Sequence, residues 1–331
     1  SAGSITGYNT LMTKLFPWQQ TVWQHIVDRV EQQRMPHAVL LTGVAGLGKK
    51  QLAVKMAESL LCLAADKQFN ACGVCHSCQI MQAGNHPDHL TIRSEEAGKS
   101  IKIDQIRALK EKQSLTPSVA KWKTVVIESA DLMTNSAANS LLKLLEEPQN
   151  NTILILTTNA VHRLPVTIRS RCQQMHLSTP DYSMILKWLD SQGVITDADQ
   201  LRKISSLTLD APFAIVNALE TNEWQSYQQI QQDFDQLIQQ QANPVQLASQ
   251  WQQLDLVKVM HQLLSTVKSR LQQQYLEYAD ASVTQHYWHI ADCIVSTIKL
   301  ISSSNNYNKT LLIEDFMVSV MRITHTKSAN H

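Results

Sequence analysis

Four cysteines that lie within seventeen residues are the part of the sequence with the clearest chemistry. They are Cys62, Cys72, Cys75 and Cys78, in the spacing C-x9-C-x2-C-x2-C. Four thiolates at this spacing suit tetrahedral Zn²⁺, and four ligands without an open position indicate a structural ion. His76 lies inside the cluster and is the alternative ligand, and an iron–sulfur cluster is the alternative cofactor. We therefore expect a structural zinc site.

A glycine-rich segment, GVAGLGKK from Gly43 to Lys50, follows a short apolar run and precedes a helical pattern. This order is typical of a loop that holds phosphate through its backbone N–H groups, with Gly43, Gly46, Gly48 and Lys49 as candidate ligands. Loops that bind Mg²⁺ have Ser or Thr after the lysine, but this chain has Lys50, whose ammonium repels a metal ion. The sequence predicts the scaffold of a nucleotide site without its metal ligand. A tight turn that binds no ligand is the alternative.

The second half of a working site, an apolar strand that ends in Asp-Glu, has also changed. The run VVIESAD places Glu128 where the metal-binding Asp belongs and Ser129 where the Glu that orients the attacking water belongs. A serine hydroxyl is a poor base near neutral pH. Together with Lys50, these two residues predict that the chain does not hydrolyse ATP, and they count against ATP binding by this chain.

Short apolar runs alternate with helical patterns in the first half of the chain. The expected strands are 37–43, 89–93, 123–131, 152–159 and 174–177, and the expected helices are 18–33, 49–63, 103–111 and 135–147. Apolar strands that alternate with helices predict a parallel sheet with helices on both faces. After about residue 180 only helical spacing continues, in two groups that we separate near residue 222.

The composition limits the classes of protein that remain. The chain has 331 residues, of which 44% are hydrophobic and 17% charged, so we expect a large core and two or three domains. The formal net charge of +1 counts against a free-standing DNA-binding protein, because neutralising phosphates needs a local excess of Lys and Arg. No apolar run approaches the ~20 residues of a membrane span and no secretory leader is visible, so we expect a cytoplasmic protein.

Three further segments carry a resemblance to a known family. They are the triplet Ser170–Cys172, the segment LLKLLEEP at Leu141–Pro148 and the triplet FPW at Phe16–Trp18. With the altered phosphate loop and the four cysteines, these segments resemble the delta prime subunits of bacterial DNA polymerase III clamp loaders, which belong to the AAA+ ATPases. The resemblance covers residues 16–177.

The resemblance implies the architecture and the division of the chain. It implies an AAA+-like α/β P-loop domain with a zinc-binding insert over residues 12–178. An all-α lid over 179–222 and an all-α collar over 223–331, which joins sister subunits, would follow. Residues 1–11 are expected to be a tag or a disordered tail.

The resemblance also assigns Arg171 as an arginine finger that acts on ATP bound by a neighbouring subunit, with Ser170 and Cys172 positioning it. A guanidinium is always charged and can stabilise the charge that develops on a transferred phosphoryl group. No residue would be catalytic within this chain itself. Without the surrounding motifs, Arg171 would be interpreted as an ordinary surface or ion-paired arginine.

The sensor positions of the family are only partly present. The segment 157–159, Thr-Thr-Asn, lies where the first sensor belongs, and a strand-end turn is the alternative interpretation. The second sensor is usually an arginine, and the segment 205–213 contains none. This is a further departure from a member that hydrolyses ATP.

The implied function is that of a non-hydrolysing stator in the clamp loader, which helps to load the sliding clamp onto primed DNA. The chain would be part of a DNA-directed DNA polymerase holoenzyme. Its partners would be the gamma/tau motor subunits and the delta subunit, with the sliding clamp and primed DNA met through the complex, and no membrane. One alternative is an ATP-hydrolysing gamma/tau-type motor subunit. Another is an unrelated zinc-containing module that binds nucleic acid.

Overall fold

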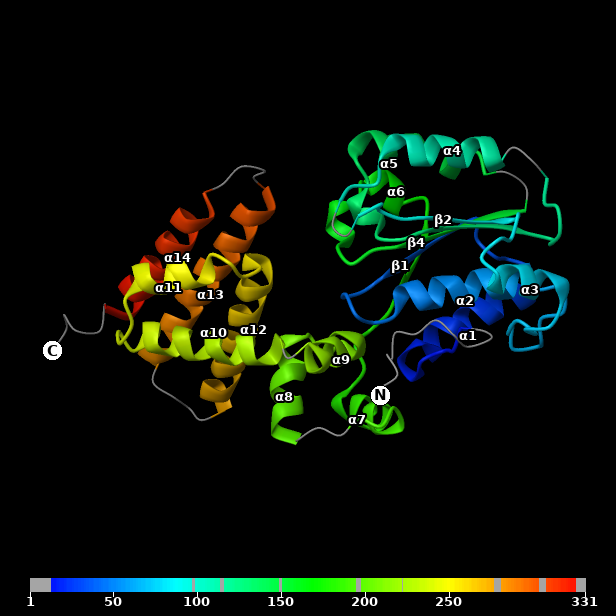
Figure 1. The fold of residues 1–331 in the computed structure, drawn as a ribbon. Helices are drawn as coiled ribbons and strands as arrows, with labels where there is room; N and C mark the ends of the chain where they lie inside the picture. Colours follow the sequence, from blue (N-terminus) through cyan, green and yellow to red (C-terminus); the bar gives the residue numbers. More distant parts are fainter. Residues whose placement is uncertain are drawn as a thin grey trace. The chain divides into compact units, whose positions relative to one another are not determined.

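The computed structural model describes residues 13–96, 99–113, 116–148, 151–194, 198–221, 223–276, 281–303 and 308–325. The tail predicted over residues 1–11 lies outside these ranges. The chain divides into two compact units: the first runs to Ile195 and includes Ala211–Phe213, and the second comprises Thr196–Asp210 and the chain from Ala214 onward. Figure 1 shows the ribbon of both units, and each unit has its own hydrophobic core.

The first unit is built on a five-stranded parallel sheet, as the sequence predicts. Its strands are β1 (Ala38–Thr42), β2 (His89–Ile92), β3 (Lys123–Ile127), β4 (Thr152–Thr157) and β5 (Gln173–His176). The strand order is β2-β3-β4-β1-β5, and each neighbouring pair is parallel. In open α/β sheets ligands bind at the carboxyl ends of the strands, where the connections diverge. Here that point is the end of β1, because β1 lies between β4 and β5.

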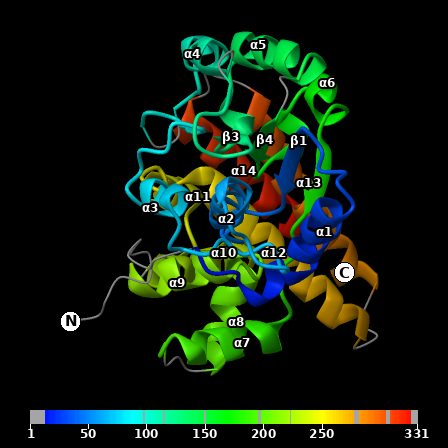
Figure 2. The ribbon, with the colours of Figure 1, turned by 90° about the vertical axis from the view of Figure 1, so that its right-hand side faces the viewer.

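Helices cover both faces of this sheet (Figure 1). The helices described in this unit are α1 (Gln20–Glu31), α2 (Lys49–Leu61), α3 (His76–Gln82), α4 (Ile103–Gln113), α5 (Asn135–Glu146), α6 (Val166–Arg169) and α7 (Tyr182–Ser191), with short 3₁₀ turns at Pro17–Gln19, Ala130–Leu132 and Val161–Arg163. Figures 1 and 2 show α4 and α5 side by side on one side of the sheet, and Figure 1 shows α1 and α2 on the other. The helices on both faces bury the apolar strands β1, β3 and β4 completely.

Helix α5 contains most of the LLKLLEEP segment and forms for local reasons. The hydroxyl of Thr134 accepts a hydrogen bond from the backbone N–H of Ala137 (3.2 Å) and so caps the helix. Ala138, Leu141 and Leu145 recur at helical spacing and are buried in the core against the sheet. Packing of this face fixes α5 against α4 and α6.

The predicted strand over 123–131 is too long. Strand β3 ends at Ile127, because Ser129 has the left-handed φ of +51° and turns the chain into a 3₁₀ segment. An L-residue in this region cannot continue a strand. Glu128 and Ser129 therefore lie just beyond the carboxyl end of β3.

The described part of the second unit contains only helices, as the sequence predicts for the chain after β5. They are α8 (Ala198–Leu207), α9 (Pro212–Glu220), which begins in the first unit, α10 (Glu223–Ile238), α11 (Pro244–Trp251), α12 (Leu256–Leu276), α13 (Ala281–Ser303) and α14 (Lys309–His325). The buried Trp251 donates from its indole nitrogen to Asp233 Oδ2 (2.9 Å). Among the described residues, no helix combines the length and apolar character that crossing a bilayer requires.

Candidate functional site

The four clustered cysteines come together in space. Their Sγ atoms all lie within 4.8 Å of one another. The Sγ atoms of Cys62 and Cys75 are 4.0 Å apart, and so are those of Cys72 and Cys78. Cys62 directly follows α2, and Cys75 is the N-cap of α3. Two helices therefore position three of the four sulfurs.

The donor set fits a tetrahedral zinc ion. Four sulfurs at about 2.3 Å from one ion would be about 3.8 Å apart, close to the observed separations. Backbone N–H groups donate to the sulfurs; for example, Cys72 N lies 3.2 Å from Cys62 Sγ. Hydrogen bonds from the backbone of Val74 and Cys75 lower the pKa of Cys72 to about 6, whereas burial raises the pKa of Cys62 and Cys78. Among the described residues, His76 is not part of the group.

A buried polar network ties the cysteine cluster to the edge of the sheet. Ser77 Oγ donates to the carbonyl of Leu61 (2.6 Å) and lies 2.8 Å from His86 Nε2. The backbone N–H of Asp88 in turn donates to His86 Nδ1 (3.0 Å). The sequence analysis did not identify Ser77, His86 and Asp88, because their spacing does not indicate a contact between α3 and the segment before β2.

The carboxylate of Asp88 extends the network to the segment before β3. It accepts hydrogen bonds from the backbone N–H groups of Ser118, Val119 and Ala120 at 2.7–2.9 Å. Burial raises the pKa of Asp88, but the three N–H groups outweigh it and hold the pKa below its usual value. The charged carboxylate thus fixes the chain on both sides of α4.

The glycine-rich loop joins β1 to α2, and only glycines fit its backbone. Gly43, Gly46 and Gly48 have φ values of +139°, +85° and +75°. A Cβ on Gly43 would lie 2.6 Å from the carbonyl oxygen of Leu177, and a Cβ on Gly48 would lie 2.7 Å from Gln19 Nε2. These φ values and close approaches explain why glycine occupies these positions.

Lys49, the candidate phosphate ligand, is folded back onto its own loop. Its Nζ donates to the carbonyls of Gly43 (2.8 Å) and Val44 (2.5 Å). Burial lowers the pKa of Lys49 to about 8, although the charge of Asp131 raises it. The ammonium thus stabilises the loop by hydrogen-bonding to the carbonyls at its start.

The outer carbonyls of the loop are also occupied. Gln19 Nε2 donates to the carbonyls of Leu47 (3.1 Å) and Gly48 (2.9 Å), and the indole of Trp18 donates to Leu47 as well (2.9 Å). All four of these residues are buried. The segment FPW-Gln therefore packs directly on the phosphate loop.

An aromatic cluster lies behind this contact. The backbone N–H of Phe213 donates to the carbonyl of Gly46 (3.1 Å). Its ring packs on Phe16, Trp18 and Trp188, with centroid distances of 4.8–6.1 Å. The chain's own side chains thus cover the loop.

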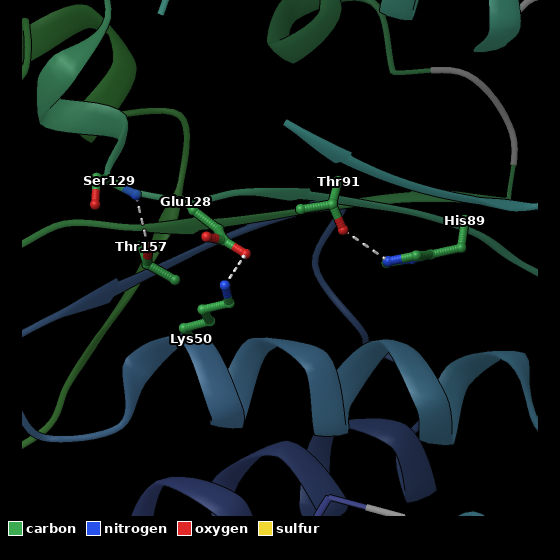
Figure 3. Close-up of polar contacts among 6 residues, drawn as sticks. All are labelled: Lys50, His89, Thr91, Glu128, Ser129 and Thr157. Atoms are coloured by element: carbon green, nitrogen blue, oxygen red, sulfur yellow. Dashed lines mark hydrogen bonds and ion pairs between the residues drawn. The ribbon is translucent and has the colours of Figure 1, made fainter. Parts of the chain in front are cut away.

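The two substituted positions of the metal site meet in an ion pair. Lys50 Nζ lies 3.1 Å from Glu128 Oε1 (Figure 3), and the side chain of Glu128 is only 15% exposed. Next to it, the backbone N–H of Ser129 donates to Thr157 Oγ1 (3.0 Å). The ammonium of Lys50 therefore supplies the positive charge that a metal ion would bring to this carboxylate.

A cavity of about 210 Å³ lies between the loop and the ends of β3 and β4. Its lining is Ala45, Gly46, Gly48, Lys49, Lys50, Gln51, Glu128, Ser129, Thr157, Asn159 and Phe213. Two of the first-sensor candidates are hydrogen-bonded to the 3₁₀ turn that follows β3. Thr158 Oγ1 and the backbone N–H of Asn159 both donate to Asp131 Oδ1, at 2.7 and 3.2 Å.

Arg171 lies outside this cavity, between α6 and β5. Its Nη2 is 2.9 Å from Glu146 Oε1, and its Nη1 donates to the carbonyl of Thr167 (3.0 Å). Ser170 Oγ donates to the same carbonyl (3.1 Å). Cys172 is buried in the core, where burial raises the pKa of its thiol to about 11. Within the triplet, Cys172 is therefore buried in the core and Arg171 lies at the surface.

Comparison with known proteins decides the family. A family model described as DNA polymerase III, delta subunit, matches residues 18–181. The DNA polymerase III subunit delta prime of Pseudomonas aeruginosa is 35% identical over 245 residues, which are 74% of this chain and 74% of that one. This chain belongs to the DNA polymerase III delta prime family. The delta prime subunit of Escherichia coli is 33% identical over 64% of this chain and 63% of its own length.

Membership of the delta prime family confirms the resemblance found in the sequence. A tau/gamma subunit of DNA polymerase III from Haemophilus influenzae is also similar, with 31% identity over 171 residues. That match covers 52% of this chain but only 24% of the tau/gamma protein. The delta prime relatives match over a larger share of both chains.

Replacing one ligand tests the cysteine cluster of this delta prime family member. We expect Cys78→Ser to reduce the zinc content well below the one ion per chain expected of the wild type, because a serine hydroxyl is a poor zinc ligand. Metal analysis of the purified chain measures this. Cys293→Ser, in α13, is the matched control and should keep the metal. Equal zinc content in both variants would contradict a four-cysteine site.

The buried ammonium of Lys49 predicts a pH dependence of stability. Between pH 8 and 10.5 the folded chain releases this proton while the unfolded chain keeps it, so the free energy of unfolding should rise with pH. The rise due to Lys49 should be on the order of 1–3 kcal/mol across that range. Denaturant unfolding at several pH values measures it. Lys49→Met should lose this rise, and Lys102→Met, at an exposed lysine, should retain it.

The Lys50–Glu128 pair predicts indifference to magnesium. Millimolar Mg²⁺ should leave the Tm of the wild type unchanged, because the carboxylate already has its cation. Lys50→Thr removes the ammonium and supplies a hydroxyl, so Mg²⁺ should raise the Tm of this variant by about 2–4 °C. Lys50→Met, which supplies no hydroxyl, should respond less. Thermal melts with and without Mg²⁺ measure these shifts in Tm. Stabilisation of the wild type by Mg²⁺ would contradict the interpretation that Lys50 takes the place of a metal ion beside Glu128.

Proposed function

We propose that this chain is the non-hydrolysing stator subunit of a DNA polymerase III clamp loader. It would help to load the sliding clamp onto primed DNA during replication, in the cytoplasm and as part of the polymerase holoenzyme. The observation that carries the proposal is the Lys50–Glu128 ion pair in a member of the delta prime family. Unlike a metal ion, the Lys50 ammonium cannot coordinate a phosphate oxygen or a water molecule; it can only donate hydrogen bonds.

The rest of the altered site supports this proposal. Ser129 stands where a catalytic base belongs, and its backbone is bound to Thr157. Lys49 and the loop carbonyls are already satisfied within the chain. A nucleotide that bound through Gly43, Gly46, Gly48 and Lys49 would first have to draw the Lys49 ammonium away from the carbonyls of Gly43 and Val44. The gamma/tau-type motor alternative is disfavoured for the same reasons.

In this proposal the catalytic contribution is made outside the chain's own site. Arg171 is 36% exposed and does not line the chain's own cavity, so it is available to ATP on a gamma/tau subunit. The chain would contact gamma/tau and delta, and it would meet the clamp and primed DNA through the complex. Residues 179–222 form the lid of this proposal, and residues 223–331 form the collar that joins the sister subunits.

The cysteine cluster has a structural role in the proposal. Cys62, Cys72, Cys75 and Cys78 hold a zinc ion that fixes the end of α2 against α3. The separate zinc-dependent nucleic-acid-binding module is disfavoured by the net charge of +1. No catalytic chemistry is assigned to the metal, because all four cysteines would be ligands and none of its positions would be open.

The decisive experiment is a reconstitution with the motor and delta subunits. We expect Arg171→Ala to assemble normally but to lose a large part of the ATPase turnover stimulated by clamp and primed DNA, because an arginine finger contributes about 10³- to 10⁵-fold at the site it serves. Arg29→Ala, an exposed arginine on α1, is the control and should keep wild-type turnover. Normal turnover with Arg171→Ala would show that the finger assignment is wrong.

A further inference from the structure

The guanidinium of Arg171 is held by two acceptors from this chain. Glu146, the last residue of α5, lies 2.9 Å from Nη2, and the carbonyl of Thr167 lies 3.0 Å from Nη1. The side chains of Arg171 and Glu146 are 36% and 49% exposed. The pair is therefore formed at the surface, where another molecule can reach it.

Glu146 is poorly placed for the stability of its own helix. The carboxyl end of a helix carries partial negative charge, so an acidic side chain there is unfavourable. The neighbouring Glu147 adds a second negative charge, and the basic residue of the last turn is Lys143. Arg171 supplies the compensating charge from outside α5. A glutamate at this place is therefore favourable for its ion pair with Arg171, although it is unfavourable for α5 itself.

We propose that Glu146 is the resting partner of Arg171 and yields it to the terminal phosphate of a nucleotide on the neighbouring subunit. This inference rests on the proposed role of Arg171 as an arginine finger. The exchange is between two anions: Nη2 leaves the carboxylate oxygen and donates to a phosphate oxygen. The contact of Nη1 with Thr167 stays and keeps the side chain directed. Glu146 is a positioning residue, since it acts only through Arg171.

The exposure of the pair makes this exchange possible. Exposed ion pairs are weak because water and salt compete with both partners. A phosphate carries more charge than a carboxylate and matches the planar fork of a guanidinium. Glu146 therefore keeps the arginine paired in the absence of nucleotide and competes only slightly with ATP when it is present.

The test uses the reconstituted complex with Glu146→Gln in this chain. We expect the KM for ATP in the clamp- and DNA-stimulated reaction to fall about two- to fivefold, with kcat close to that of wild type, because the competing anion is gone. The difference should shrink at high ionic strength. Glu147→Gln removes the same charge one residue away and should behave as wild type.

A second measurement keeps the inference testable on the chain alone. In ¹⁵N NMR spectra, rotation of the Arg171 guanidinium should become faster in Glu146→Gln than in Glu147→Gln or wild type, because only the first loses the ion pair. Unchanged rotation would overturn the inference.

The kinetic outcomes separate the two proposals. An unchanged KM, or a fall in kcat, with Glu146→Gln would overturn the resting-partner role while a loss of turnover with Arg171→Ala still supported the finger. Normal turnover with Arg171→Ala would instead remove the proposed function itself.

Discussion

The contact between Lys50 and Glu128 is the constraint on which the rest of the site depends. A magnesium ion brings two charges and several open positions, which phosphate oxygens and water fill. The ammonium brings one charge, is tethered to α2 and offers only hydrogen-bond donors. It neutralises Glu128 but cannot coordinate phosphate oxygens and a water molecule as a metal ion does. In the proposed non-hydrolysing role, the pair would hold the loop against the end of β3 as a structural junction.

A nucleotide site must also leave its binding groups free until the ligand arrives. In this chain Lys49 is bound to the carbonyls at the start of the loop, while Gln19 and Trp18 occupy the carbonyls at its end. These hydrogen bonds stabilise the loop, and a phosphate that used Lys49 would have to draw its ammonium away from the carbonyls of Gly43 and Val44. The contacts that stabilise Lys49 within the loop thus oppose its use as a phosphate ligand. Arg171 does not line the cavity beside this junction and is held at the surface by Glu146.

The local features of the site could be predicted from the sequence, and the long-range contacts could not. The spacing of the cysteines, the glycine loop and the apolar strands are each encoded within about twenty residues. The partners Lys50 and Glu128 are far apart in the chain, and only the parallel pairing of the sheet brings them together. Helices α3 and α6 were missed because they are too short to show a periodic pattern. The early end of β3 depends on the backbone of a single residue, Ser129.

The two ion pairs differ in the hydration of their carboxylates, and this difference separates their roles. Lys50 and Arg171 are about equally exposed, at 37% and 36%, but Glu128 is 15% exposed and Glu146 is 49% exposed. If Lys50 left Glu128, the carboxylate would lose its charge partner with little water to replace it, which is costly. If Arg171 left Glu146, water would solvate the carboxylate at once. In the proposed stator role the first pair would therefore persist and the second would exchange, so the chain would keep its own site closed while it offered Arg171 to a neighbouring subunit.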